Sequence, residues 1–135
     1  MFQLSKKVEY GLIAVRHLAM AQRGKTFTTK EIADAYNIPY ELLAKVMQKL
    51  AKERYIVSYQ GVHGGYVLAR DPHDLKVADI INAIEGRTNV ALVKCETEGP
   101  EECIIHTTCT IKNPLVRLQG TINRMFSEMT IMEMV

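Results

Sequence analysis

The fold is decided by residues 28–69, which read TTKEIADAYNIPYELLAKVMQKLAKERYIVSYQGVHGGYVLA. Thr28 stands three residues before Glu31, a spacing typical of a capping box, in which the two side chains pair with free backbone N–H groups at a helix start. Pro39 disfavours helix in the residue before it but fits the first turn of a new helix. The stretch therefore predicts two short helices that meet at a tight turn, the second running from Pro39 to about Lys52.

A β-hairpin is predicted after the two helices. Ile56–Tyr59 and Tyr66–Leu68 are rich in β-branched, aromatic and aliphatic residues, and the glycine-rich residues 60–65 separate them. Helix, helix and hairpin in this order predict a winged helix-turn-helix. Upstream, apolar residues from Val8 to Ala19 recur at helical spacing, and Gly24 is a plausible stop for that helix.

The second half of the chain predicts two further helices with an aperiodic segment between them. Apolar residues in 77–84 follow helical spacing, and Gly86 supplies a left-handed stop. Residues 87–112 show no periodicity and contain all three cysteines. Residues 113–114, Asn-Pro, offer an N-cap and a first-turn proline for a long helix that reaches at least Met129. The apolar stripe of that helix consists of Leu115, Leu118, Ile122, Met125, Phe126 and Met129.

We therefore expect a mainly α fold with a small β-hairpin, in which a winged helix-turn-helix domain precedes a long C-terminal helix. The expected units are residues 1–86 for the winged domain, 87–112 for the cysteine-bearing loop and 113–135 for the helix. An amphipathic helix at the end of a small chain requires a partner for its apolar stripe. The 135 residues, 47% of them hydrophobic, suffice for one core.

Charge is unevenly distributed along the chain. The 17 lysines and arginines against 15 aspartates and glutamates give a net charge of +2. Residues 1–69 hold ten basic and five acidic residues, a net charge of +5. The rest of the chain holds seven basic and ten acidic residues, a net charge of −3. This pattern suits a polyanion-binding half joined to a regulatory half, although ordinary surface scatter explains it equally well.

The second helix of a helix-turn-helix enters the major groove of DNA and presents the solvent-facing residues near its N-terminus to base edges. Those residues here are Tyr40, Glu41, Ala44, Lys45 and Gln48. Lys45 and Gln48 can donate to guanine or adenine edges, and Glu41 can accept from cytosine. The alternative is a winged scaffold with a merely solvated polar face. We favour DNA binding because the capped helix, the turn and the hairpin coincide with the basic half.

Phosphate contacts are expected from a second set of residues. The set consists of Thr29, Lys30, Lys49 and Lys52. At the tip of the hairpin, His63 and the neighbouring Gly64 could let the wing lie close to the DNA backbone or the minor groove.

Cys95, Cys103 and Cys109 form the only cysteine set in the chain. Their spacing differs from the paired Cys-x2-Cys knuckles of structural zinc sites. Thiolates are the standard ligands of iron-sulfur clusters, and three of them leave one iron position for another residue or solvent. Reduced cysteines without metal, or a redox pair plus a spare thiol, remain open alternatives.

The chain resembles, over nearly its whole length, the Rrf-type family of bacterial transcription regulators, which includes the IscR-, NsrR- and RirA-like iron-sulfur sensors. The matching stretches are residues 4–10 (LSKKVEY), 32–50, 61–68 (GVHGGYVL), 79–86 (DIINAIEG) and 129–131 (MTI). The resemblance implies a homodimer joined through its C-terminal helices that binds a pseudo-palindromic double-stranded DNA operator. It also implies that the three cysteines hold an oxidisable cluster, whose loss or damage shifts operator affinity.

The resemblance leaves the fourth cluster ligand open. In the IscR-like branch a histidine follows three positions after the last cysteine, where this chain has Lys112, whose amine is protonated near neutral pH. Glu9 occupies the place where NsrR-like members use a carboxylate from the other subunit, and His106 lies between two of the cysteines. We favour Glu9 over His106. The gap between Cys95 and Cys103 resembles that of the RirA-like branch. Because the usual histidine is absent, we expect a 4Fe-4S rather than a 2Fe-2S cluster.

Other functions fit the sequence less well. The same DNA-binding fold could be regulated by cysteine thiol oxidation or by a protein partner, without a cluster. An enzyme or a cluster-delivery protein is disfavoured, because the sequence has no phosphate loop, nucleophile elbow or metalloprotease helix motif. No apolar run approaches the ~20 residues that span a bilayer, so we expect a cytoplasmic protein with no membrane partner.

Overall fold

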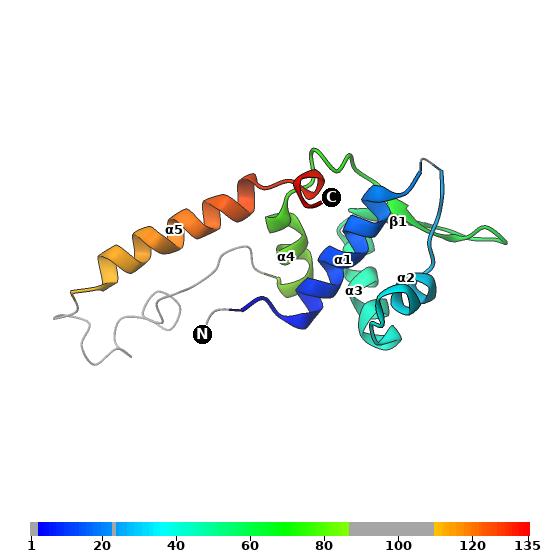
Figure 1. The fold of residues 1–135 in the computed structure, drawn as a ribbon, viewed down its shortest axis with the longest axis horizontal. Helices are drawn as coiled ribbons and strands as arrows, with labels where there is room; N and C mark the ends of the chain where they lie inside the picture. Colours follow the sequence, from blue (N-terminus) through cyan, green and yellow to red (C-terminus); the bar gives the residue numbers. More distant parts are fainter. Residues whose placement is uncertain (1–2, 23, 87–109) are drawn as a thin grey trace.

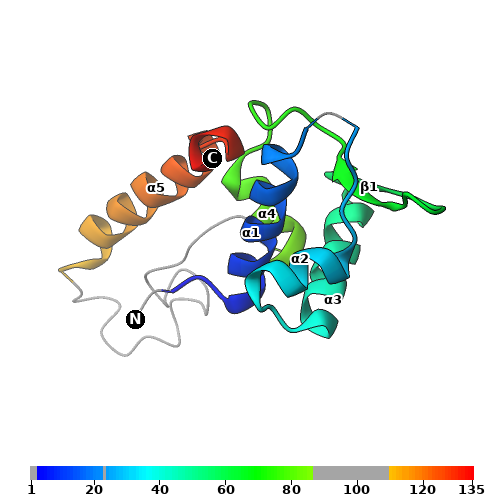
Figure 2. The same cartoon turned by 45° about the vertical axis from the view of Figure 1, so that its right-hand side comes forward.

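The computed structural model of the chain describes residues 3–22, 24–86 and 110–135. Within these ranges its elements are, in order, α1 (Lys6–Met20), α2 (Thr29–Tyr36), α3 (Tyr40–Lys52), β1 (Ile56–Tyr59), β2 (Gly65–Leu68), α4 (Val77–Glu85), α5 (Lys112–Glu128) and the 3-10 helix η3 (Ile131–Met134) (Figure 1). The hairpin, α2 and α3 lie on one side of α1, and α5 leaves on the opposite side (Figure 2). This architecture confirms the predicted fold class, mainly α with a small β-hairpin.

The core is formed where α1, α3 and α4 pack together. Its fully buried side chains include Val15 of α1, Met47 and Leu50 of α3, and Ile80 of α4. The helices approach closely at Gly11 of α1, where glycine leaves room for its neighbours. A Cβ atom at this position would collide with Cδ1 of Ile84 and lie 3.2 Å from Cγ1 of Val46.

The helix-turn-helix forms as the sequence predicts, with small differences at its caps. Thr28 Oγ1 accepts from the backbone N–H of Glu31 at 3.1 Å, and its hydroxyl lies 3.2 Å from Oε1 of the same glutamate. The Glu31 carboxylate therefore pairs with the hydroxyl, whereas a capping box would place it on the backbone N–H. Asn37 ends α2 in the left-handed conformation with φ 55°. Pro39 caps α3 and is not its first residue, so the helix starts one position later than predicted.

His17 joins α1 to α2. Its Nδ1 lies 2.7 Å from the hydroxyl oxygen of Tyr36, and its ring meets those of Phe27 and Tyr36 edge-on, with centroids 4.5 and 5.4 Å away. Burial lowers the pKa of His17, so the neutral imidazole is favoured here. Tyr36 is 37% exposed, and its hydroxyl takes part in this contact.

The two strands form an antiparallel hairpin in which Ile56 pairs with Leu68 and Tyr59 with Gly65. Gly86 ends α4 in the left-handed conformation with φ 75°, which confirms the predicted stop. The long helix α5 begins at Lys112 with Ile111 as its N-cap. Asn113 was expected to be that cap; it lies inside the first turn instead.

The chain returns to the core after α5, which the sequence did not predict. The helix ends at Glu128, one residue before the expected Met129. Ile131, the first residue of η3, is fully buried, and its backbone N–H donates to the carbonyl oxygen of Leu75 at 2.8 Å. Arg16 Nε donates to the carbonyl oxygen of Met134 at 2.7 Å. The last residues therefore pack with α1 and α4, although the sequence grouped them with the long helix.

Among the helices in the described ranges, none is both long enough and apolar enough to cross a lipid bilayer.

Candidate nucleic-acid interface

Helix α3 has one buried and one exposed face. Four apolar side chains at helical spacing are almost completely buried: Leu43, Val46, Met47 and Leu50. The residues predicted to read bases lie on the other side of the helix. Of these, Tyr40, Glu41, Lys45 and Gln48 are exposed and Ala44 is half-buried. One helix can thus pack against the core and still present polar side chains outward.

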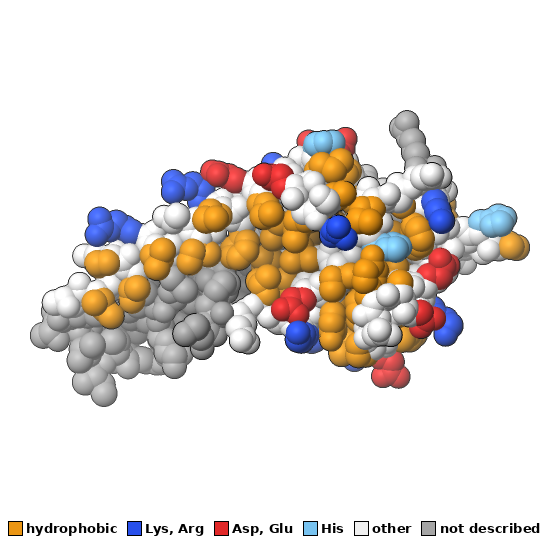
Figure 3. Space-filling view, in the orientation of Figure 1, with side chains coloured by type: hydrophobic (Ala, Val, Ile, Leu, Met, Phe, Trp, Pro, Cys, Tyr) orange, Lys and Arg blue, Asp and Glu red, His pale blue; other side chains and the backbone are white. Residues whose placement is uncertain are grey.

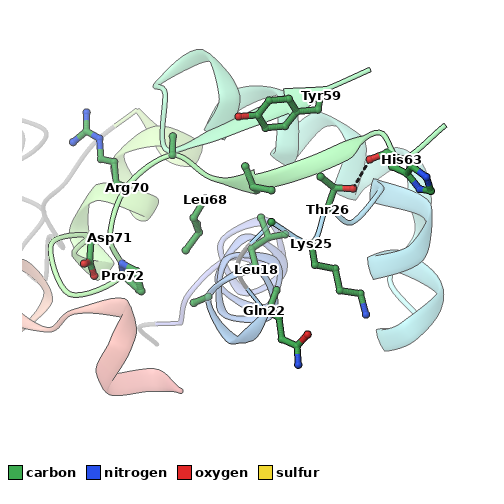
Figure 4. A pocket seen from close by; sticks show the side chains of 15 residues that line it. Leu18, Gln22, Lys25, Thr26, Tyr59, His63, Leu68, Arg70, Asp71 and Pro72 are labelled. Carbon is green, nitrogen blue, oxygen red and sulfur yellow. Dashed lines mark hydrogen bonds between the residues drawn. The ribbon is translucent and has the colours of Figure 1, made fainter. Parts of the chain in front are cut away.

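The hairpin beside α3 is fixed by the segment that precedes α2. Phe27 and Tyr66 exchange two backbone hydrogen bonds, of 3.1 and 2.7 Å, which add a third extended segment to β2. The Thr26 hydroxyl donates to the carbonyl oxygen of His63 at 2.6 Å (Figure 4). The wing is therefore held in a defined position relative to the N-terminus of α2.

Two glycines allow this close approach. Gly65 has φ 148°, and a Cβ atom there would lie 2.7–3.0 Å from the backbone of Phe27. A Cβ atom at Gly64 would lie 2.7 Å from the carbonyl oxygen of Tyr59. Gly64, predicted as a DNA contact, is thus also required by the geometry of the wing, as is its neighbour.

A groove of about 410 Å³ lies between the start of α2, the start of α3 and the wing. Thr28, Thr29 and Lys30 line one side, Tyr40 contributes from α3, and residues 58–61 and 64–66 of the hairpin supply the other wall. A helix N-terminus with hydroxyl groups and an ammonium favours a phosphate. Lys30 lies 3.8 Å from Asp34, but both side chains are more than two-thirds exposed, so this ion pair leaves Lys30 available.

Lys49, predicted as a phosphate contact, is exposed on α3 and also contacts the end of α4. Its Nζ donates to the carbonyl oxygen of Ile84 at 3.0 Å, so its ammonium is engaged by the end of α4. Nothing in the sequence indicates this contact, because it joins residues 35 positions apart.

A second and larger cleft, of about 990 Å³, lies between the end of α1 and β2 (Figure 4). Leu18 and Leu68 contribute apolar side chains to it, and Lys25 and Arg70 contribute charged ones. The two cations lie over aromatic rings, 5.2 Å from Phe27 and 4.9 Å from Tyr55 respectively. The cleft shares Tyr59 with the groove beside α3 and also includes His63.

Of the residues predicted to hold a cluster, only Glu9 falls in the described part of the chain; Cys95, Cys103, Cys109 and His106 lie outside it. No group of three or more His, Cys, Asp or Glu side chains in the described ranges could hold a metal ion.

Glu9 lies in the first turn of α1 and accepts from Lys6 Nζ at 2.9 Å, with 43% of its side chain exposed. The hydrogen bond and the charge of Glu9 raise the pKa of Lys6. The Ser5 hydroxyl donates to a carboxylate oxygen of Glu85, which places the start of α1 beside the end of α4. Ser5, the N-cap of α1 and four residues before Glu9, is thus in contact with the last residue of α4.

The chemistry of the donor set fits an iron-sulfur cluster. Three thiolates would supply the usual ligands of such a cluster, and the Glu9 carboxylate, whose partner Lys6 is exposed, would be able to exchange that partner for iron. Soft sulfur donors favour an iron-sulfur cluster over magnesium or calcium.

Comparisons with known proteins agree with this geometry. The family model described as "Rrf2: Iron-dependent Transcriptional regulator" matches residues 4–135. The chain is 28% identical over 133 residues to the HTH-type transcriptional regulator NsrR of Shouchella clausii, covering 98% of this chain and 88% of the relative. It is 34% identical over 107 residues to a putative HTH-type transcriptional regulator of Aquifex aeolicus, covering 76% of this chain and 74% of that one.

Two solved structures show the same architecture. CymR, the global cysteine regulator of B. subtilis, superposes with a TM-score of 0.80 at 25% identity, covering 99% of this chain and 96% of that one. IscR of T. potens superposes with a TM-score of 0.73 at 25% identity, covering 98% and 85%.

Proposed function

The chain belongs to the Rrf2 family of DNA-binding transcriptional regulators, and from this premise we propose that it is a dimeric operator-binding protein that senses iron, redox state or nitric oxide through an iron-sulfur cluster. Its relatives are transcriptional regulators and not enzymes. The observation that carries the proposal is the exposed polar face of α3 beside a fixed wing, in a chain that also bears Cys95, Cys103 and Cys109.

In this proposal α3 enters the major groove. Lys45 and Gln48 donate to purine edges and Glu41 accepts from cytosine, with Tyr40 and Ala44 beside them on the same helix. Thr29 and Lys30 hold a phosphate in the groove at the start of α2. The wing tip, with His63 and Gly64, follows the DNA backbone or the minor groove.

A homodimer is supported by the exposed apolar side chains along α5. None of the residues of α5 is buried, and Leu118, Met125 and Met129 are 50%, 64% and 39% exposed. Figure 3 shows hydrophobic side chains following one another along this helix. A second copy packed on the stripe would remove it from water, and two-fold symmetry then suits a pseudo-palindromic operator.

The cluster would be held by the three cysteines, with Glu9 of the other subunit as the preferred fourth ligand and His106 as the alternative. When bound, it would supply a group that oxygen, nitric oxide or iron shortage can oxidise or remove. We favour a 4Fe-4S over a 2Fe-2S cluster. The proposed units are residues 1–86 for DNA binding, 87–112 for the cluster and 113–135, with most of α5, for dimerisation.

The test is anaerobic reconstitution with iron and sulfide, followed by metal and sulfide counts. A duplex obtained by in vitro selection from a random DNA library then serves as the operator in fluorescence anisotropy. We expect stoichiometric cluster and a changed dissociation constant after its removal. Cys95→Ala should abolish both, and Glu9→Gln should change the spectrum or stability of the cluster. A colourless protein whose DNA affinity is indifferent to Cys95→Ala would contradict cluster sensing.

A second candidate keeps the DNA-binding fold and replaces the cluster by thiol oxidation or a protein partner. It is favoured by the likeness to CymR, whose structure is described as that of a cysteine regulator. Non-reducing electrophoresis after mild oxidation should then reveal a disulfide that shifts operator affinity. Stoichiometric iron and sulfide would count against this candidate.

A further inference from the structure

The last turn of α4 is joined to the DNA-reading helix by the hydrogen bond from Lys49. The ammonium of Lys49, in the last turn of α3, donates to the carbonyl oxygen of Ile84 at 3.0 Å. Carbonyl groups in the last turn of a helix have no partner within that helix and lie at the negative end of its dipole. Lys49 therefore caps α4 from another helix and ties the position of one to the other.

The same turn of α4 is also fixed to α1. The Ser5 hydroxyl donates to the Glu85 carboxylate, and the Ile84 side chain packs into the space left by Gly11. Val46 of α3 packs at the same glycine. Because such interiors are close-packed, a displacement of the last turn of α4 must move α3, α1 or both.

Lys49 also lies one helical turn beyond Lys45, on which base reading depends in the proposed function. With 3.6 residues per turn, a change in the tilt of α3 at Lys49 moves the outward-facing Lys45 relative to the groove of the DNA. The bond to Ile84 thus acts close to the reading surface without belonging to it.

We propose that Lys49 is a positioning residue that couples the last turn of α4 to the orientation of α3 on DNA. This turn immediately precedes residues 87–112. The inference rests on the proposed function, since it names the contact through which the state of the cysteine-bearing segment reaches α3. The role expected for Lys49 from the sequence, a phosphate contact, is the alternative that the test below distinguishes.

The test compares Lys49→Met, which keeps the aliphatic stem, with Lys49→Arg, which keeps a donor. Lys7→Met, at an exposed lysine of α1, is the matched control. The ratio of operator dissociation constants between cluster-loaded and cluster-free protein measures the coupling, which is typically about 5–150-fold in allosteric proteins. We expect Lys49→Met to bring this ratio close to one, and Lys49→Arg and Lys7→Met to keep most of the wild-type ratio.

Two results would overturn the role of Lys49. One is an unchanged ratio in Lys49→Met, whatever its melting temperature, which would leave Lys49 a merely stabilising residue. The other is an equal loss of operator affinity by the cluster-loaded and cluster-free forms of Lys49→Met, together with a salt dependence of binding that is smaller by about one phosphate contact. This result would make Lys49 a direct DNA ligand.

Hydrogen exchange tests the coupling without the cluster. Coupling between sites is reciprocal, so selected DNA bound to α3 should increase the protection of the Gly86 amide, which donates to Asn82 at the end of α4. The increase should vanish in Lys49→Met. If DNA increases the protection of the Gly86 amide in the wild type but removal of the cluster does not change operator affinity, the proposed function alone is contradicted. Absence of the response in wild type would contradict the coupling.

Discussion

The Thr26 hydroxyl donates a 2.6 Å hydrogen bond to the backbone carbonyl oxygen of His63, so the loop before α2 holds the tip of the wing. Thr26→Val removes the donor and keeps the shape of the side chain. We expect a loss of about 1 kcal/mol in the free energy of unfolding, typical for one such bond, and weaker DNA binding because the wing becomes less ordered. Urea unfolding and anisotropy measure the two effects.

Thr121→Val is the control for this substitution. The Thr121 hydroxyl donates at 3.1 Å to Arg117 on the exposed surface of α5, far from the wing in sequence. We expect a change in stability within about 0.5 kcal/mol. Equal DNA binding by the wild type and Thr26→Val would show that the tether has no role in recognition.

Lys45 and Lys30 should contribute to DNA binding in different ways. Lys45→Ala removes a proposed base contact, so we expect a loss of about 1–3 kcal/mol on the selected duplex and relaxed sequence preference. Lys30→Ala removes a proposed phosphate contact, so affinity should fall similarly on all sequences, with a salt slope smaller by about one. Titrations on selected and scrambled duplexes at several salt concentrations separate the two. Identical behaviour of both variants would refute the assignment.

Gly65→Ala should destabilise the fold. Its φ of 148° and the nearby backbone of Phe27 leave no place for a methyl group. We expect a loss of roughly 1–3 kcal/mol, as for a residue held in a strained conformation. At Gly120 of α5 no heavy atom lies within 4 Å of the corresponding Cβ position. Gly120→Ala should therefore stabilise the helix by roughly 0.5–1 kcal/mol, and thermal unfolding of the pair checks the contrast.

The stability of the protein should depend on the protonation of His17. Burial lowers its pKa below the usual 6.5, so between the folded and unfolded pKa values the unfolded state binds more protons. Stability should then fall as the pH drops below about 6.5 and through the folded pKa. His17→Gln should show a smaller decrease between pH 7 and pH 5 in urea unfolding; a slope identical to that of the wild type would exclude His17 as its origin.

The pH dependence due to Asp71 should lie in a separate range. Hydrogen bonds from the backbone and side chain of His73 lower the pKa of its carboxyl group. The ionised Asp71 carboxylate therefore contributes to the stability of the folded state above the usual pKa of 3.8. This contribution is lost as the pH falls below that value and through the lowered pKa. This range does not overlap with the one assigned to His17.

Leu118→Asp should convert the proposed dimer into a folded monomer. The side chain is 50% exposed in one chain, so the substitution does not disturb the core, but a carboxylate would lie within the apolar contact between two copies of α5. Sedimentation velocity and circular dichroism measure mass and helicity. Arg124→Asp, at an exposed residue of the same helix, is the control for added negative charge. A Leu118→Asp dimer of wild-type stability would place the interface elsewhere.

The parts of the fold that depend on local chemistry could be predicted from the sequence. The end of α4 at Gly86 needs only a glycine that accepts the left-handed conformation, and the buried face of α3 follows from helical spacing. Long-range contacts could not be predicted. Ile131 carries no local signal that it will pair with Leu75, so the last residues were assigned to the long helix.

The candidate site follows the same division. Lys45 and Gln48 could be identified as candidate base contacts because they lie opposite the apolar face of α3, a pattern that is visible in the sequence. Lys49 has the charge and spacing of a phosphate ligand, but its hydrogen bond to the carbonyl oxygen of Ile84 could not be predicted from the sequence. Met20 has the apolar character of a core residue and is 50% exposed, because α1 ends there. The exposure and contacts of such side chains depend on residues that are distant in the sequence.

The return of the chain at Ile131 has a consequence for dissecting the protein. A fragment cut after residue 86 would keep every element that reads DNA but would lose a fully buried isoleucine and the backbone partners of Leu75 and Val77. Its core would be left open to water at that point. The winged portion and the chain terminus should therefore unfold in a single cooperative transition.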